Sequence, residues 1–208
     1  MFLFKPKKPE EEKKPEVSQA NIDLEIITNM NQEFALSLEL KETLNTALKV
    51  IINRINAQAA NIFLINDQKK KFECIASINQ DYLDEYELDL TDGVMAKAVE
   101  QKKCIRVGNV RKDVREIAEF YFDLDNKTNF TTYSVLCSPL IAANECIGVI
   151  HCLNKKTDDK LFIEEDRTLL ETLSAPAALA IRNAKMAKEM VEKNKIQKEV
   201  EIVGEIQK

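Results

Sequence analysis

The chain has 208 residues, of which 45% are apolar and 31% are charged, a composition typical of a soluble globular protein with one domain and helical extensions. The net charge of −5 argues against sequence-independent nucleic-acid binding, which needs a basic surface, and the absence of tryptophan argues against an aromatic platform for bases. The five cysteines lack close spacing and are expected to be reduced thiols in a cytoplasmic protein. The opening tetrapeptide MFLF is too short for a signal peptide or a membrane span, and a charged stretch follows it directly.

The N-terminal part of the chain is expected to hold a linker and two helices. Residues 5–16 contain three of the five prolines among lysines and glutamates, so residues 1–16 are predicted to be a disordered charged linker that cannot form a core. Apolar residues recur at helical spacing between residues 22 and 30. They recur again from Leu40 to Ile55, which predicts a long amphipathic helix.

Short strands and helices are predicted to alternate in the middle of the chain. Residues 59–67 form an apolar run that ends in Asn-Asp, and residues 70–77 alternate apolar with polar residues, so the two segments are predicted to pair as a hairpin. Residues 92–103 are predicted to be a short helix, residues 104–110 a short strand, and residues 114–122 another helix.

The last third of the chain is predicted to be a second hairpin followed by one long helix. Residues 133–141 and 145–154 are the two strands, joined by the sequence AAN, and the helix begins near Glu164. Pro176 lies inside this helix, where proline removes a backbone hydrogen bond and usually causes a kink. The order of elements predicts an α+β domain with an antiparallel sheet and with the terminal helices packed together on one face.

We find no catalytic or metal-binding constellation in the sequence. His151 is the only histidine, and Cys152 follows it on a predicted strand, where adjacent side chains point to opposite faces. The two therefore cannot share a metal ion or act as a catalytic dyad, and we expect His151 to be packed or to line a pocket. The four glycines are spaced too widely for a phosphate-binding loop. The acidic residues 164–166 fall in a first helical turn, where the helix dipole favours them.

The segment NKTNFTTYSVLCSPLIAANECIGVIHCLNKK resembles the core of GAF domains, most closely the subgroup found in cyclic-nucleotide phosphodiesterases and adenylyl cyclases. The resemblance covers about Ile22 to Ala184 and implies a GAF sensor domain over residues 17–184. The family's motif NK-(x)n-F-xxx-D-E departs at Arg167, which replaces the final glutamate and argues against assuming a cyclic nucleotide. The residues that match the motif are Asn154, Lys155, Phe162 and Asp166.

This motif is expected to join the last strand to the last helix. Lys155 can fold back onto Asp166, and the side chain of Phe162 can pack on the core and so hold the connection between the strand and the helix. Ile163 takes the N-cap position, so the usual side-chain cap is missing and Asp166 is an acid at the third helical position. The Lys155–Asp166 pair is expected to be exposed and to contribute only about 0–1 kcal/mol. In this family the motif supports the domain without touching the ligand.

The resemblance also implies a small-molecule pocket on the sheet face opposite the bundled helices, walled by residues 104–134. Hydroxyls at Thr131 and Thr132 would bond a phosphate or ribose edge and Phe122 would stack, whereas the alternative is that both threonines only satisfy backbone groups. The ligand is unknown, with a cyclic nucleotide among the candidates, and no metal, haem or attached bilin is expected. The predicted ligand contacts are Arg106, Ile117, Phe120, Phe122, Asp125, Thr131 and Thr132.

Beyond the domain, apolar residues of the last helix recur at alternating steps of three and four, the spacing of a seam between two copies of the chain. Residues 185–208 are predicted to be a signalling coiled coil, in which Asn194 breaks the seam and the pattern resumes in a shifted phase. The final EVEIVGEIQK resembles the linker into PPM-type serine/threonine phosphatase domains of bacterial stress regulators, which implies a C-terminal output domain. The predicted seam residues are Leu170, Leu173, Ala177, Ala180, Ala184, Ala187 and Val191.

Together these features predict a non-enzymatic, homodimeric sensor domain. A ligand would order lid residues 111–132, and the last helix would change its packing or register. Three other functions are also compatible with the sequence. They are a strict cyclic-nucleotide receptor, a ligand-free dimerisation module whose pocket is filled by bulky side chains such as Tyr121, and a redox sensor. A redox sensor would use Cys104 or Cys137, and its functional thiol would have to be exposed and have a low pKa.

Overall fold

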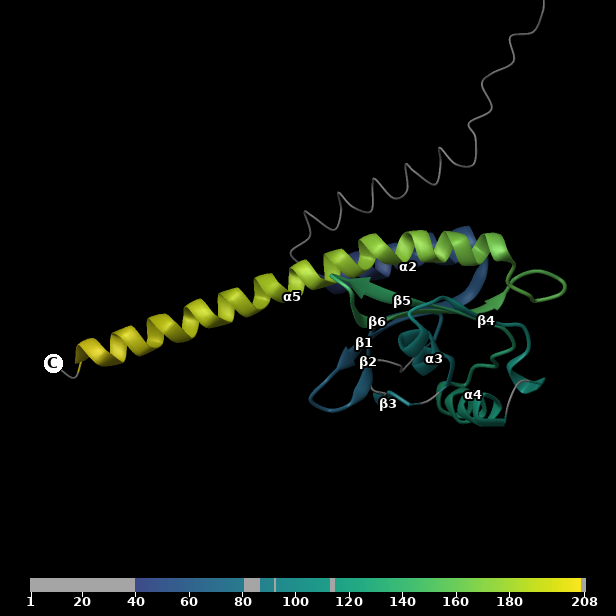
Figure 1. Ribbon diagram of the computed structural model, residues 1–208, viewed down its shortest axis with the longest axis horizontal. Helices are drawn as coiled ribbons and strands as arrows, with labels where there is room; N and C mark the ends of the chain where they lie inside the picture. The colour runs from purple at the N-terminus through teal and green to yellow at the C-terminus, as the bar shows by residue number, and fades with distance from the viewer. Residues whose placement is uncertain (1–39, 81–86, 92, 113–114, 207–208) are drawn as a thin grey trace, which may run out of the picture.

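The computed structural model describes residues 40–80, 87–91, 93–112 and 115–206 (Figure 1). The predicted linker at residues 1–16 and the predicted helix at residues 22–30 lie outside the described residues. Within them the structure is an α+β domain whose last helix extends beyond the rest of the fold (Figure 1), so the predicted fold class is confirmed.

The centre of the domain is a six-stranded sheet in the order β3–β2–β1–β6–β5–β4, in which every neighbouring pair is antiparallel. Both predicted hairpins are present, and β5 and β6 are joined through Ala143 and Asn144, which both have positive φ as in a type I′ turn. The three-residue strand β3 was not predicted. The strands are β1 (Ala57–Asn66), β2 (Lys71–Ile78), β3 (Glu87–Asp89), β4 (Ile105–Val107), β5 (Val135–Ala142) and β6 (Glu145–Lys155).

The helices lie close to their predicted positions. Helix α4 extends to Thr128 rather than ending at residue 122, and α5 continues through Pro176 without interruption, so this proline does not end the helix. The helices are α2 (Leu40–Ile55), α3 (Gly93–Gln101), the 3-10 helix η2 (Val110–Lys112), α4 (Arg115–Thr128) and α5 (Glu164–Ile206). No described helix is long and apolar enough to cross a membrane.

The two faces of the sheet carry two separate cores. On one face α2 and α5 lie side by side (Figure 1), and their apolar residues form what we call the first core with the sheet. On the other face α3 and α4 cover what we call the second core (Figure 1). The first core includes Leu48, Ile51, Ile62, Leu136, Ile150, Cys152, Phe162, Leu170 and Leu173. The second core includes Phe63, Met95, Tyr121, Leu124, Cys137, Val149 and Leu153.

Strand β6 shows how the alternation of side chains divides these cores. Ile150 and Cys152 point into the first core, whereas Val149 and Leu153 point into the second. His151 contacts the rings of Phe63 and Tyr121, so it faces the second core. The prediction that His151 and Cys152 face apart is therefore confirmed.

The first part of the predicted seam on α5 belongs to the interior of the domain instead. Leu170, Leu173 and Ala177 are buried in the first core, where they pack on the sheet and α2. They share the three-four spacing of a coiled coil because that same spacing also produces the apolar face of any helix packed on a sheet. Ile181 is the last buried residue of α5 within the described residues, and the helix then projects beyond the sheet (Figure 1).

Candidate functional site

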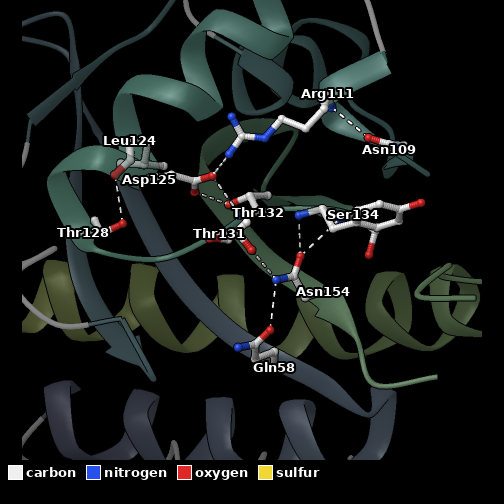
Figure 2. A network of polar contacts seen from close by, with 11 residues as sticks. Gln58, Asn109, Arg111, Leu124, Asp125, Thr128, Thr131, Thr132, Ser134 and Asn154 are labelled. Carbon is white, nitrogen blue, oxygen red and sulfur yellow. Dashed lines mark hydrogen bonds and ion pairs between the residues drawn. The ribbon is translucent and has the colours of Figure 1, made fainter. Parts of the chain in front are cut away.

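Asn154, at the end of β6, connects three segments of the chain through its side-chain amide. Its oxygen Oδ1 accepts hydrogen bonds from the backbone N–H groups of Tyr133 (2.6 Å) and Ser134 (3.2 Å). Its nitrogen Nδ2 donates to Oε1 of Gln58 on β1 (3.0 Å) and to the carbonyl oxygen of Thr131 (2.7 Å), as Figure 2 shows. The φ of Asn154 is 55°, a conformation that asparagine tolerates better than most residues. Asn154 thus fixes the segment between α4 and β5 to the end of β6.

Lys155 connects β6 to the two terminal helices. Its ammonium Nζ donates to the carbonyl oxygen of Ile55 at the end of α2 and to Oδ1 of Asp166 in the first turn of α5, both at 2.6 Å. The two side chains of the ion pair are only 10% and 8% exposed, so the expectation of an exposed pair is wrong. The reason is that the chain returns to the end of α2, which covers Lys155 and provides a second acceptor.

Asp166 also caps α5. Its Oδ2 accepts the backbone N–H of Ile163 at 2.9 Å, which is the half of a capping box that an acid at the third helical position makes. Phe162 is buried in the first core. The carbonyl oxygen of Phe162 accepts a hydrogen bond of 2.8 Å from Nη1 of Arg106. The residues of the predicted motif therefore lie together at the joint between β6 and α5.

Arg106 does not lie with the other predicted ligand contacts. It is directly opposite Leu136 in the β4–β5 pairing, and Leu136 belongs to the first core, so Arg106 points toward the joint with α5 and not toward α4. Its side chain is exposed. The structure thus places it on the opposite face of the sheet from the expected pocket.

Asp125 and Thr132 form the centre of a polar network between α4 and β5 (Figure 2). Oδ1 of the buried Asp125 accepts the hydroxyl of Thr132 at 2.6 Å, and its Oδ2 accepts the backbone N–H of Thr132 at 2.8 Å. The guanidinium of Arg111 reaches the same carboxylate and makes an ion pair with it. The hydroxyl of Thr132 is therefore already used inside the domain, while Thr131 contributes its carbonyl to Asn154.

The remaining predicted contacts lie on α4. The ring of Phe122 is 57% exposed, and the guanidinium carbon of Arg111 lies 5.8 Å from its centroid, which places this ring on the outer surface. Ile117 and Phe120 belong to the same helix, and their side chains lie outside the described part of the chain. The structure thus brings Asp125 and Thr132 into contact, with Thr131 beside them, and places Phe122 apart.

The sequence reasoning missed a contact between His151 and Tyr121. The hydroxyl of Tyr121 lies 2.7 Å from Nε2 of His151, and the two rings are stacked with centroids 5.7 Å apart and an interplanar angle of 20°. Both residues are fully buried. Burial lowers the pKa of His151 to about 3, so its imidazole is neutral, and burial raises the pKa of Tyr121. This pair holds α4 against the centre of the sheet.

The thiols suggested for a redox sensor are poorly suited to that role. Cys104 and Cys137 are both buried, and burial raises the pKa of Cys104 to about 12 and also raises the pKa of Cys137. A reactive cysteine needs an accessible thiolate, and these two residues are neutral thiols at pH 7. Among the described residues no cluster of three or more His, Cys, Asp or Glu side chains could hold a metal ion.

A groove of about 450 Å³ lies away from the predicted pocket, where α5 leaves the sheet. It lies beside the turn between β5 and β6, and residues of both charge signs contribute to its walls. Lys102, Asn144, Cys146, Ile181, Arg182 and Lys185 are among the lining residues.

We expect the substitution Lys155→Met to lower the free energy of unfolding by about 3 kcal/mol, because it leaves the nearly buried carboxylate of Asp166 without its cation. Arg167→Met is the matched control, since Arg167 makes only exposed ion pairs with Glu164 and Glu171. It should leave the stability unchanged within error. Urea unfolding monitored by circular dichroism measures both, and equal effects of the two substitutions would contradict the importance of the buried pair.

His151 should not titrate in the folded protein between pH 8 and pH 5, because its pKa is lowered to about 3. The unfolded chain binds a proton at this histidine near its ordinary pKa of 6.5, so the contribution of His151 to stability falls by about 1.4 kcal/mol per pH unit below that value. The chain has a single histidine, so the imidazole signals in NMR spectra are assigned without mutation. A midpoint between pH 5 and pH 7 would show that the imidazole is accessible to solvent.

Comparisons with known proteins agree on the fold of the chain. A sequence profile of the GAF domain family matches residues 37–182. The chain is 24% identical over 143 residues to a probable 3′,5′-cyclic phosphodiesterase of Caenorhabditis elegans, an alignment that covers 64% of this chain and 19% of the relative. The chain therefore spans about a fifth of the length of that relative.

Solved structures of GAF domains are similar to this structure throughout the domain. The GAF domain of a phosphoenolpyruvate-protein phosphotransferase from Coxiella burnetii is 17% identical, with a TM-score of 0.69 over 83% of this chain and 99% of that one. The corresponding domain from Acinetobacter is 19% identical, with a TM-score of 0.65 over 80% and 96% of the two chains. The profile match over more than half of the chain, together with this shared fold, shows that the chain belongs to the GAF domain family.

Proposed function

We propose that this chain is the regulatory sensor part of a signalling protein, in which it binds a small molecule, dimerises through its terminal helices and passes its ligand state to a C-terminal output domain. GAF domains are small-molecule sensor and regulatory domains in signalling, and the domain itself regulates rather than catalyses. The ligand, the dimer and the output domain are the parts of this proposal that need experiments.

The observation that carries the proposal is a path from α4 to α5 made of hydrogen bonds that are joined through adjacent residues of the chain. Asp125 on α4 binds Thr132, and the preceding residue, Thr131, accepts a hydrogen bond from Asn154 (Figure 2). Lys155 follows Asn154 in β6 and binds Asp166 at the start of α5. A ligand that moves α4 would therefore shift groups that are in direct contact with the output helix, provided that it binds the two arrangements with different affinity.

Dimerisation is supported by apolar side chains on the surface of α5. Leu179, Met186 and Met190 are each more than half exposed, and their spacing of seven and four residues places them on the side of α5 that points away from the first core. Val191 and Ile196, farther along, are also exposed. The predicted seam at Ala180, Ala184, Ala187 and Val191 lies on the adjacent side of the helix, so the two stripes together would form a broad apolar face for a second copy.

The strict cyclic-nucleotide receptor is the second candidate, because the curated relatives are named as cyclic-nucleotide phosphodiesterases. A phosphate near Thr132 would have to compete with the carboxylate of Asp125 for the hydroxyl of Thr132 and for the guanidinium of Arg111. The burial of Tyr121 against His151 favours the third candidate, a ligand-free dimerisation module, because a side chain of the protein occupies the space under α4.

Ligand binding and coupling can be tested together. Thermal unfolding with cAMP, cGMP, AMP, GMP and neutral metabolites first identifies a compound that stabilises the protein. For such a compound we expect amide hydrogen exchange to change in the first turns of α5, and we expect Asn154→Ala to abolish that change while binding remains. Gln58→Leu is the control, because it removes one partner of Asn154 but keeps the bond to Thr131. Binding that leaves exchange in α5 unaltered would contradict the proposed signal path, and the absence of any binder would favour the ligand-free module.

The double substitution Met186→Glu and Met190→Glu should convert the dimer to a monomer, because it buries two carboxylates in the proposed apolar interface. Sedimentation velocity measures the mass. The control is Lys185→Glu with Lys195→Glu, which changes the net charge twice as much on other sides of the same helix and should leave the mass unchanged. If both doubles behave alike, this face of α5 is not the interface.

A further inference from the structure

The two hairpins β1–β2 and β5–β6 separate from each other at one end of the sheet, and we call this opening the fork. The pairing of β1 with β6 ends at Leu64, opposite Gly148, although both strands extend further. Beyond this point β1 pairs only with β2, and β6 pairs only with β5. Residues 65–67 and 145–147, which we call the fork edges, therefore have no strand of the described chain between them. Open strand edges of this kind pair readily with another extended segment.

The fork is built into the fold by one glycine and two β-bulges. A side chain at Gly148 would collide with the carbonyl oxygen of Phe63, so only glycine allows β1 and β6 to approach so closely just before they separate. Ile75 in β2 and Ile147 in β6 have no opposite residue within their hairpins, which marks a bulge in each. A bulge bends its strand and often lies next to a functional site. Both hairpins are thus bent beside the point where they separate.

The fork opens into the groove where α5 leaves the sheet. This groove of about 450 Å³ is within the size range of ligand sites. Ile181, Arg182 and Lys185 of α5 border it. Arg182 and Lys185 make no ion pair with another residue that the structure describes. The other charged residues of its lining are Lys102, Asp67 and Glu145.

These features together define the chemistry of an occupant. The fork edges require an extended backbone that offers N–H and C=O groups. Arg182 and Lys185 require carboxylates on the side of that backbone that faces α5. Ile65 packs toward the second core, on the other face of the sheet, so the opposite side of the occupant should be apolar. Successive side chains of a strand point to opposite faces, so acidic and apolar residues should alternate in the occupant.

Residues 22–26 of this chain, with the sequence IDLEI, have this alternation. In an extended conformation their three apolar side chains would share one face, and the carboxylates of Asp23 and Glu25 would share the other. The surrounding residues 17–39 contain four acidic residues and no lysine or arginine, which complements the cations of α5. The helical spacing noted between residues 22 and 30 does not exclude a strand, because so short a run satisfies both periods.

The position of α2 brings this segment to the fork. Helices α2 and α5 lie side by side (Figure 1), and they are antiparallel because Lys155 contacts the last carbonyl of α2 and the first turn of α5. The 16 residues of α2 span about 24 Å, and Ile181 lies about 26 Å from the start of α5. Leu40 therefore lies beside the part of α5 that borders the groove. Residues 27–39 can span up to about 40 Å, so residues 22–26 can reach the fork.

We propose that residues 22–26 of the same chain occupy the fork as an additional short strand, with their two carboxylates facing Arg182 and Lys185. This strand pairs with the fork edges and joins the projecting part of α5 to the body of the domain. It thereby sets the direction in which α5 projects. The inference goes beyond the proposed sensor function and does not depend on a ligand.

Amide hydrogen exchange of the full chain, followed by NMR, tests whether the fork is occupied. Amides of the fork edges should exchange at least tenfold more slowly in the unaltered protein than in Asp23→Lys with Glu25→Lys, because α5 repels the altered segment and water then reaches the edges. Glu11→Lys with Glu12→Lys is the matched control, since it changes the net charge equally and should keep the slow exchange. Equal exchange rates in all three proteins overturn the proposal.

Reversing both sets of charges tests the contact with α5. Arg182→Glu with Lys185→Glu should also remove the slow exchange of the fork edges. Combining these substitutions with Asp23→Lys and Glu25→Lys should restore it, an effect that mere loss of stability does not produce. If the combined variant still exchanges fast, the proposed pairing with α5 is wrong.

A flexible crosslinker with two maleimide groups identifies the chain that supplies the strand. Cys146 lines the groove, so a cysteine introduced by Leu24→Cys should be linked to it within one chain. Peptide mass spectrometry of the monomer band should detect this link, and Cys146→Ser should abolish it. A link between two chains would show that a second copy supplies the strand, and no link would show that the fork takes another occupant. Either result overturns the assignment to the same chain.

Discussion

The arrangement of the whole domain depends on one ammonium group. Lys155 ends β6, and its Nζ lies 2.6 Å from both the last carbonyl of α2 and the carboxylate of Asp166 in α5. An ammonium with so little access to water requires good acceptors, so neither helix can move away from the end of β6 without a large loss of free energy. The beginning of the described chain and its long final helix are therefore tied to the same central strand.

Both faces of the sheet combine an apolar core with polar contacts, but the polar contacts lie in different places. The first core is made of apolar side chains from α2, α5 and the sheet, and Lys155 joins the two helices at its end. On the second face, α4 packs Tyr121 and Leu124 into the second core and adds two polar contacts, Tyr121 with His151 and Asp125 with Thr132. Polar contacts of this kind can be exchanged for contacts with a ligand at little net cost, whereas apolar packing cannot.

Much of the fold could be predicted from the sequence, because its longer elements carry a clear periodicity. The two hairpins and the helices from Leu40 and Glu164 follow from runs of eight or more patterned residues. Strand β3 has three residues, too few to show a pattern, and its position is set by pairing with β2. The first residues of the predicted coiled-coil seam, Leu170, Leu173 and Ala177, are instead part of the first core. The sequence does not separate the two cases, because a helix packed on a sheet and a helix in a coiled coil have the same spacing of apolar residues.

The candidate site could be predicted only in part, because its contacts join residues that are far apart in the chain. The Lys155–Asp166 pair was foreseen from a motif eleven residues apart, but its burial depends on Ile55, a hundred residues earlier. Arg106 was assigned to the wrong face because a strand of three residues has no pattern that fixes which side chain points where. The side of β6 on which His151 lies was predictable from alternation, while its partner Tyr121 lies on another element, thirty residues away.

Because α5 is long, a small change in its tilt becomes a larger displacement of its C-terminal end. The helix has 43 residues, and Ile181 is the last one that the described domain buries. The remainder projects for about 38 Å, at 1.5 Å per residue, as a lever whose fulcrum is the end of the sheet. A tilt of about 5° at that fulcrum displaces the tip by about 3 Å, comparable with the length of a hydrogen bond. A small rearrangement around Asp166 is thereby amplified into a movement large enough to make or break contacts at the far end of the helix.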